Sequence, residues 1–299
     1  MRPRLFTPIL TLGLACLISL QASTQSAQLR IVQAAPTGEI GRISDANEIR
    51  IVFSEPMVAL GRIPSNPTPP WITIQPAIRG TYRWSGTTIL IFTPDPATPL
   101  PNATRVTVTI DGSAMSDAGR SLGQPYRFTF TTPTVRLTSM RWYRRQDRFD
   151  QPVMLVLNFN QRVRAEDVLA HAQARYEPHD WDAPVLSERA RARLTATEPN
   201  GVAAFDARVA AARQTAARRD AITLRGASDW DRERFPPKDT MVVLETTTVP
   251  PPGTWIELTI DAQMPGVEGT APPPQAQRST AELDPVFFAY GFACDQACD

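Results

Sequence analysis

Histidine is the side chain that most readily moves protons near neutral pH, and this chain contains two, His171 and His179. His171 lies in a run of helix-forming residues, whereas His179 is followed by Asp180 and Asp182 in a polar stretch. Catalysis by histidine needs a nucleophile beside the ring and an acid that orients it, and adjacency in sequence supplies neither. We therefore expect His179 to be a solvated loop residue, and we expect no catalytic residues.

Motifs that start a catalytic or nucleotide-binding site are absent from the sequence. It has no Gly-x-Ser-x-Gly turn, no His-Glu-x-x-His helix and no glycine-rich phosphate loop. An exported enzyme of this length usually carries at least one of them. The sequence therefore predicts a protein that is not an enzyme.

Metal binding is the second chemistry to test. Structural zinc needs four Cys or His ligands in paired spacings, but Cys294 and Cys298 form one pair without a second. Asp117, Asp295 and Asp299 do not fall in an Asp-x-Asp-x-Asp-Gly calcium loop. We expect no metal and no cofactor, and in an oxidising compartment Cys294 and Cys298 could form a disulfide with each other.

Charge gives no sign of a nucleic-acid partner. The chain has 31 basic and 30 acidic residues, so no long-range field favours an anionic polymer. One arginine-rich region is interrupted by acidic residues, which favours a solvated face over a phosphate-binding one. Its arginines are Arg189, Arg191, Arg193, Arg208, Arg213, Arg218 and Arg219, and its acids are Glu188, Glu198, Asp206 and Asp220.

The first 27 residues have the composition of an export signal. Arg2 and Arg4 precede an apolar run at 5–20, and small polar residues follow at 22–27. The run is short for a membrane span. Lipidation at Cys16 is a less favoured alternative, because Gly13 stands where lipoprotein signals carry a large aliphatic residue and apolar residues continue after the cysteine. We expect a periplasmic or cell-envelope protein, tethered to the inner membrane only if Cys16 is lipidated.

The rest of the chain is organised around short strands. Apolar and polar residues alternate in 49–53, 105–110 and 126–130, as a strand with one buried face requires, and 89–94 is a further short run of β-branched and aromatic residues. Twenty-nine prolines, which helix interiors and central strands exclude, must lie in connections and at edges. The pattern predicts an all-β protein built from β-sandwiches.

The strand pattern occurs twice. The segment 53–58 has a counterpart at 159–164, and 100–111 is echoed by 249–261. The turn that follows keeps its length, since eight positions separate Asp111 from Gly119 and Asp261 from Gly269. Two consecutive domains at 35–133 and 134–292 are the economical interpretation, each ending in an aromatic strand, at 126–130 and 285–292.

The second copy is longer. From Phe53 to Asp111 is 58 positions and from Phe159 to Asp261 is 102, so about 44 residues are inserted. Acidic residues open one helical run after 164, and an apolar face runs through a second run at 205–216. We expect a partly helical insertion at about 165–235.

Eight short segments are distinctive enough to compare with known families. They are Phe-Ser-Glu-Pro-Met-Val at 53–58, Tyr-Arg-Trp at 82–84, Leu-Ile-Phe-Thr-Pro-Asp at 90–95, Pro-Asn-Ala-Thr at 101–104, Phe-Thr-Phe-Thr-Thr-Pro at 128–133, Leu-Asn-Phe-Asn-Gln at 157–161, Val-Leu-Ala-His at 168–171 and Tyr-Gly-Phe at 290–292. The first five resemble the Ig-like repeats at the start of bacterial alpha-2-macroglobulins. The last three lie in the second half, which is similar to a macroglobulin-type domain, and the resemblance covers nearly all of the chain after the signal.

Membership of that family would imply an exported protease trap, with a bait segment that proteases cut and a thioester that captures them. This sequence departs from the family at the thioester, which needs Cys-x-Glu-Gln. Gln296 is only two positions after Cys294, and no Glu-Gln follows. The resemblance therefore implies a non-enzymatic scaffold similar to the amino-terminal arm of such a trap, with residues 293–299 as the start of a truncated next module and proteases or envelope proteins as partners.

A second interpretation stays open. Ig-like repeats of this kind also occur in surface-layer and adhesion proteins, where they act as spacers. The same residues would then belong to an Ig-like spacer or adhesion module of a cell-envelope protein.

Overall fold

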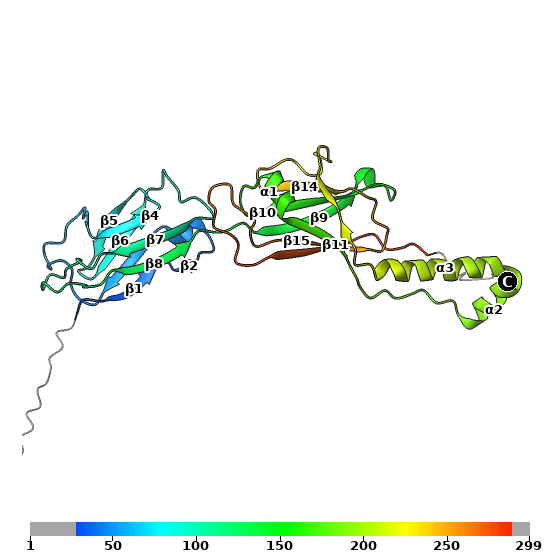
Figure 1. Ribbon diagram of the computed structural model, residues 1–299, viewed down its shortest axis with the longest axis horizontal. Coiled ribbons are helices and arrows are strands. Elements are labelled where there is room, and N and C mark those ends of the chain that lie inside the picture. The colour runs from blue at the N-terminus through cyan, green and yellow to red at the C-terminus, as the bar shows by residue number, and fades with distance from the viewer. Residues whose placement is uncertain (1–27, 289–299) are drawn as a thin grey trace, which may run out of the picture.

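The computed structural model describes residues 28–288, which form two β-sandwich units that follow each other along the long axis of the molecule (Figure 1). We call residues 28–133 unit 1 and residues 134–288 unit 2. The expected export signal, Cys16, Cys294, Cys298 and the expected start of a further module at 293–299 lie outside the described residues.

Unit 1 consists of two four-stranded sheets packed face to face. Neighbouring strands are antiparallel except β2 and β8, which are parallel. One sheet has the order β1 (Ile31–Ala35), β3 (Ile49–Phe53), β6 (Ile89–Pro94) and β5 (Gly80–Ser85); the other has the order β2 (Gly38–Glu39), β8 (Tyr126–Thr131), β7 (Arg105–Ile110) and β4 (Ile72–Gln75). A short 3-10 helix, η1 (Ile43–Ala46), lies between β2 and β3.

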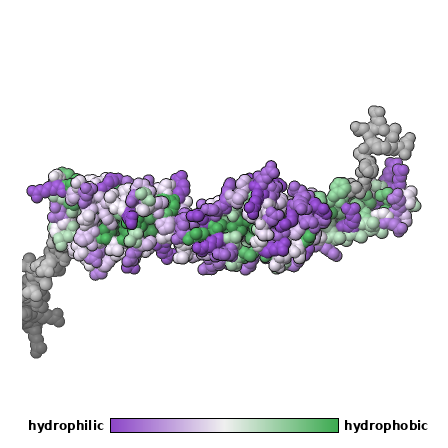
Figure 2. Space-filling view, turned by 90° about the horizontal axis from the view of Figure 1, so that it is seen from above, coloured by the Kyte–Doolittle hydropathy of each residue, from purple (hydrophilic) through white to green (hydrophobic). Residues whose placement is uncertain are grey.

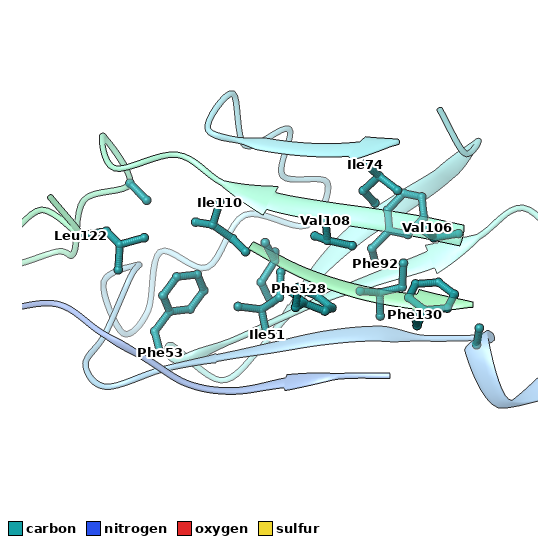
Figure 3. Close-up of a cluster of buried hydrophobic side chains, with 14 of the residues drawn as sticks. Ile51, Phe53, Ile74, Phe92, Val106, Val108, Ile110, Leu122, Phe128 and Phe130 are labelled. Carbon is teal, nitrogen blue, oxygen red and sulfur yellow. The ribbon is translucent and has the colours of Figure 1, made fainter. Parts of the chain in front are cut away.

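The alternation seen in the sequence is the packing pattern of this unit. Every second side chain of β7, namely Val106, Val108 and Ile110, is fully buried, while the threonines between them point outward. They meet residues such as Ile51 and Phe53 from the opposite sheet (Figure 3). Burying one such side chain contributes about 1.5–3 kcal/mol, so the alternating positions account for the sandwich.

Unit 2 is built from two sheets of the same kind. One has the order β13 (Leu224–Gly226), β14 (Met241–Thr246), β10 (Val153–Phe159) and β9 (Leu137–Arg144); the other has the order β12 (Ala221–Ile222), β11 (Ala172–Glu177), β15 (Trp255–Ile260) and β16 (Gln277–Glu282). A 3-10 turn, η2 (Arg145–Asp147), joins β9 to β10. The all-β fold with two consecutive sandwiches, expected from the sequence, is confirmed.

The two units share one topology. In unit 1 the sheet order β1-β3-β6-β5 corresponds to β9-β10-β14-β13 in unit 2, and β8-β7-β4 corresponds to β16-β15-β11. Matching backbone bonds support this: Phe53 N donates to Thr88 O (2.9 Å), and Phe159 N donates to Thr240 O (2.8 Å). The sequence match of 53–58 with 159–164 is therefore a structural equivalence.

The turns after β7 and β15 are also equivalent. The Asp111 carboxylate accepts the amide of Ser113 at 2.8 Å, and the Asp261 carboxylate accepts the amide of Gln263 at 2.7 Å. An aspartate that binds the backbone two residues on closes a turn locally. The equal spacing from each aspartate to its glycine reflects this shared turn.

The inserted region of unit 2 is partly helical, as expected, but it is not continuous over 165–235. Helix α1 (Ala165–His171) is followed at once by β11, a strand of the sandwich, and only then by α2 (Glu188–Thr197) and α3 (Pro199–Ala216). In β11, Ala174 and Tyr176 are buried while Gln173 and Arg175 point outward. The alternation was hidden in the sequence because alanine favours helices, so Ala172 and Ala174 continue the helical pattern of the preceding run.

The last strand of unit 2 was wrongly placed. We expected an aromatic strand at 285–292, but the described part of that segment, 285–288, is not a strand, and 289–292 lie outside the described residues. The closing strand is β16, which pairs with β15 along its whole length. It is an edge strand in which Ala281 alone is fully buried, so it lacks the apolar alternation that identifies a strand.

Candidate functional site

His171 has a structural partner. Its Nδ1 is hydrogen-bonded to both carboxylate oxygens of Asp261, at 2.9 and 3.1 Å, and it stands at the C-terminal end of α1. The same carboxylate closes the turn after β15 by accepting the amide of Gln263. The pair therefore ties α1 to that turn, and it could not be predicted because 90 positions separate the partners.

His179 does not form a dyad with the Asp180 carboxylate. Its Nδ1 is hydrogen-bonded to the backbone carbonyl of Asp180 and its Nε2 to the carbonyl of Gly253, both at 2.9 Å. The ring stacks on Trp255 with centroids 4.4 Å apart and an angle of 10° between the planes. Both ring nitrogens thus face carbonyl oxygens, so His179 is a packed side chain rather than the solvated one expected.

The remaining candidates from the sequence are not brought together. Within residues 28–288 no group of three or more His, Cys, Asp or Glu side chains could hold a metal ion. Asp117 lies in the loop after β7, where its amide donates to the Pro56 carbonyl at 2.9 Å. Asp295 and Asp299 lie outside the described residues.

Most of the arginine-rich region forms the α2–α3 hairpin. Arg191 of α2 makes a two-bond ion pair with Asp206 of α3 (2.7 and 2.8 Å), and Arg218 pairs in the same way with Asp220. Arg208 instead donates to the Phe287 carbonyl at 2.7 Å and lies over the Phe288 ring. The hairpin thereby holds the segment that leaves unit 2. None of the helices between residues 28 and 288 has the length and apolar character needed to cross a bilayer.

The most elaborate polar contact is the joint between the units, and it begins at Glu39. One carboxylate oxygen of Glu39 accepts three hydrogen bonds, from the Thr134 amide (3.1 Å), the Thr134 hydroxyl (2.7 Å) and the Arg136 guanidinium (2.9 Å). Burial alone would raise the pKa of this carboxyl, but the bonds from Thr134 and Arg136 outweigh it and hold the pKa below its usual value of 4.5. Unit 1 therefore fixes the first residues of unit 2.

A loop of unit 2 completes the joint. The Ala271 amide donates to the Ala103 carbonyl at 2.7 Å, and Glu268 accepts both the amide and the side-chain NH₂ of Asn102, at 2.9 and 3.1 Å. A second segment of unit 2 also contacts unit 1, since the Gln161 side chain donates to the Pro133 carbonyl at 3.0 Å. Contacts at several separate points restrict rotation about the connection at Pro133.

Two glycines let the loop approach so closely. A Cβ on Gly266 would stand 2.8 Å from the Ala103 Cβ, and a Cβ on Gly269 would overlap the carbonyl oxygens of Asn102 and Ala103. Only a residue without a side chain fits these positions. The sequence contained one signal for this site, the spacing from Asp261 to Gly269, which equals that from Asp111 to Gly119, but it did not show that the loop meets unit 1.

Two β-sandwich units joined by a tight polar interface define a modular β-sandwich protein. Residues 25–132 match the family described as the bacterial Ig-like domain, so unit 1 is an Ig-like domain. This match supports the Ig-like part of the resemblance seen in the sequence and does not extend to alpha-2-macroglobulin.

Comparison with solved structures gives only distant likenesses. L,D-transpeptidase 3 from Mycobacterium tuberculosis, in complex with a faropenem-derived adduct, is 11% identical over 54% of this chain and 67% of that one, with a TM-score of 0.23. An L,D-transpeptidase from Mycobacterium tuberculosis H37Rv is 11% identical over 53% of this chain and 69% of that one, with a TM-score of 0.22. At these TM-scores the likeness carries no argument. No curated protein matches the chain.

Proposed function

We propose that this protein is an exported, non-enzymatic scaffold whose two β-sandwich units act as one stiff arm in the cell envelope. The observation that carries the proposal is the joint, where Glu39, Asn102 and Gln161 each bind across the boundary between the units. A connection that served only as a tether would not need these bonds. A stiff arm sets the distance and the direction between whatever is attached to its two ends.

The Ig-like domain at 25–132 supports the envelope setting. His171 Nδ1 is hydrogen-bonded to Asp261, whose carboxylate also closes a turn, and both ring nitrogens of His179 are hydrogen-bonded to carbonyl oxygens. The side chains whose chemistry is most constrained lie at the joint instead. This supports a role in positioning rather than catalysis.

A second, narrower candidate is the amino-terminal arm of a bacterial alpha-2-macroglobulin protease trap. Its support is the repeated unit with an insertion in the second copy, together with the motifs at 53–58, 101–104 and 157–161. On this view the arm contributes protein contact, while bait and thioester belong to other parts of a complete trap.

Two experiments on the chain from residue 28 onward test these proposals. Small-angle X-ray scattering should show one extended particle of constant shape, and a particle that populates many bent shapes would contradict a stiff arm. Incubation with a broad-specificity protease should give neither covalent capture nor inhibition. Capture by this chain alone would contradict the view that it lacks the working parts of a trap.

A further inference from the structure

The joint between the units uses two different surfaces. Unit 1 supplies a corner, formed by residues 101–104 and 132–134, and unit 2 supplies a docking loop, residues 262–271. Hydrogen bonds run both ways between them, since the Ala271 amide donates to the Ala103 carbonyl and Asn102 donates to Glu268. Because both units have the same topology, unit 2 should have a corner of its own and unit 1 a loop of its own. Within the chain neither of these is used in the joint.

The corner of unit 2 is found from its backbone bonds. Ala103 and Gly253 both have left-handed backbones, with φ of 48° and 75°. The Ala103 amide donates to the Pro133 carbonyl at 2.9 Å, and the Gly253 amide donates to the Asp284 carbonyl at 2.6 Å. Residues 251–254 and 283–285 of unit 2 thus repeat the corner on which unit 1 receives its neighbour.

An apolar groove lies at this second corner. It has a volume of about 460 Å³, and its rim exposes 62% of Phe149 and 79% of Phe287. Apolar surface of the α3 region is visible at the right of Figure 2. Exposed aromatic side chains gathered around a groove are typical of a protein-binding surface. The residues that line the groove include Phe149, Arg208, Ala211, Pro252 and Phe287.

The unused docking loop of unit 1 is residues 112–123. It follows the Asp111 turn as 262–271 follows the Asp261 turn. The Gln28 side chain donates to the Leu122 carbonyl, so the loop lies where the chain enters unit 1, at the left of Figure 1 and remote from unit 2. Its Met115 side chain is 55% exposed.

We propose that the docking loop of one copy, residues 112–123, binds the groove of a second copy, so that chains associate head to tail. Met115 supplies an apolar side chain for a groove walled by proline, alanine and phenylalanine. Asp117 on the same loop is opposite in charge to Arg208 on the groove wall. In this contact a loop of one unit meets the corner of another, as the loop of unit 2 meets the corner of unit 1 within the chain.

The new contact differs from the internal joint in one respect. The carbonyl of Gly253, which corresponds to that of Ala103, is already hydrogen-bonded to His179, and an asparagine is replaced by Pro252. The second corner therefore offers apolar contact in place of the polar bonds to Asn102. Because the two surfaces are different, the association is heterologous and leaves a free loop and a free groove on every complex.

The test is sedimentation of the chain from residue 28 onward over a wide range of concentrations. We expect concentration-dependent growth beyond a dimer. Met115→Asp and Ala211→Asp should each weaken association by about tenfold or more, the scale of a buried interface residue. The matched control for Met115→Asp is Leu60→Asp, because the Leu60 side chain is 88% exposed and lies outside the loop. The matched control for Ala211→Asp is Ala210→Asp, because Ala210 is the neighbouring residue and lies on the exposed side of α3.

Mixing the two variants makes the test directional. The Met115→Asp copy keeps its groove and the Ala211→Asp copy keeps its loop, so an equimolar mixture should form a heterodimer and nothing larger. A chain that is monomeric at all concentrations overturns the proposal. So does a mixture that does not form the heterodimer, or an effect of the control substitutions equal to that of Met115→Asp. The stiff arm of the proposed function does not depend on the outcome.

Discussion

Gly269 of unit 2 lies directly against the backbone of Ala103 in unit 1, so close that a methyl group on the glycine would collide with the Ala103 carbonyl oxygen. The two residues are far apart in sequence and belong to different sandwiches. Their contact makes the joint a packed interface, in which small changes of shape are costly.

Gly269→Ala should therefore loosen the joint. The added methyl group overlaps backbone atoms, which cannot move aside as a flexible side chain can, and such overpacking costs about 1–3 kcal/mol. We expect a lower melting temperature and a wider range of shapes in solution scattering. Gly226→Ala is the control, because nothing lies within 4 Å of a Cβ there. Equal behaviour of the two variants would contradict the packed joint.

Glu39 should make the stability of the joint depend on pH. Its pKa is lowered in the folded protein, so the carboxylate contributes stability above its unfolded pKa near 4.5, and this contribution is lost as the pH falls through the folded pKa. In Glu39→Gln a neutral side chain replaces a charged acceptor of hydrogen bonds. We therefore expect the unfolding free energy at neutral pH to fall by about 1.5–3 kcal/mol.

The measurement is denaturant unfolding of both proteins from pH 7 downward. The difference in unfolding free energy between wild type and Glu39→Gln should shrink as the pH drops below 4.5. A difference that stays constant down to the lowest pH would show that the carboxylate charge of Glu39 does not hold the joint.

Arg144 should anchor the loops at the far end of unit 2. Only 3% of its surface is exposed, and its guanidinium donates to the Pro250 carbonyl at 3.0 Å and to Asp284 at 3.3 Å. Arg144→Met leaves those acceptors without a donor, so we expect a loss of about 2–4 kcal/mol in unfolding free energy. Arg141→Met, at an exposed position of the same strand, should change it by about 0.5 kcal/mol or less.

Gln146 offers a stabilising substitution. It has a φ of 55° in the turn between β9 and β10, a region that suits glycine better than residues with a Cβ. Because its side chain is exposed, Gln146→Gly removes strain without removing packing, and we expect a gain of about 0.5–1 kcal/mol. Arg148→Gly, where φ is −109°, should instead be neutral or destabilising in the same unfolding assay.

The sandwich fold could be predicted because a strand with one buried face carries apolar residues at every second position of the sequence. In β7 the apolar residues Val106, Val108 and Ile110 alternate with polar ones, and the same pattern in β15 made the duplication visible. Strands that lack this pattern were missed. β16 carries Arg278, Thr280 and Glu282 on its outer face and one small buried alanine, so its pairing with β15 could not be inferred.

The joint could not be predicted, because its partners are distant in sequence and individually ordinary. Glu39 and Thr134 are 95 positions apart, and Asn102 and Glu268 are 166 positions apart. The equal spacing from Asp111 to Gly119 and from Asp261 to Gly269 indicated a shared turn, but whether such a loop meets another unit depends on the packing of the two units. The same applies to His179, whose ring partners lie on two separate segments.

The central claim is that unit 1 and unit 2 hold a fixed relative orientation. Pulsed electron–electron double resonance, which measures the distance between two spin labels, tests it most directly. The labels are attached at Arg127→Cys on β8 and Arg278→Cys on β16, two exposed strand positions in different units. Cys294 and Cys298 are replaced by serine. We predict one narrow distance distribution that broadens in Gly269→Ala. A broad distribution in the chain without the Gly269 substitution would contradict the account.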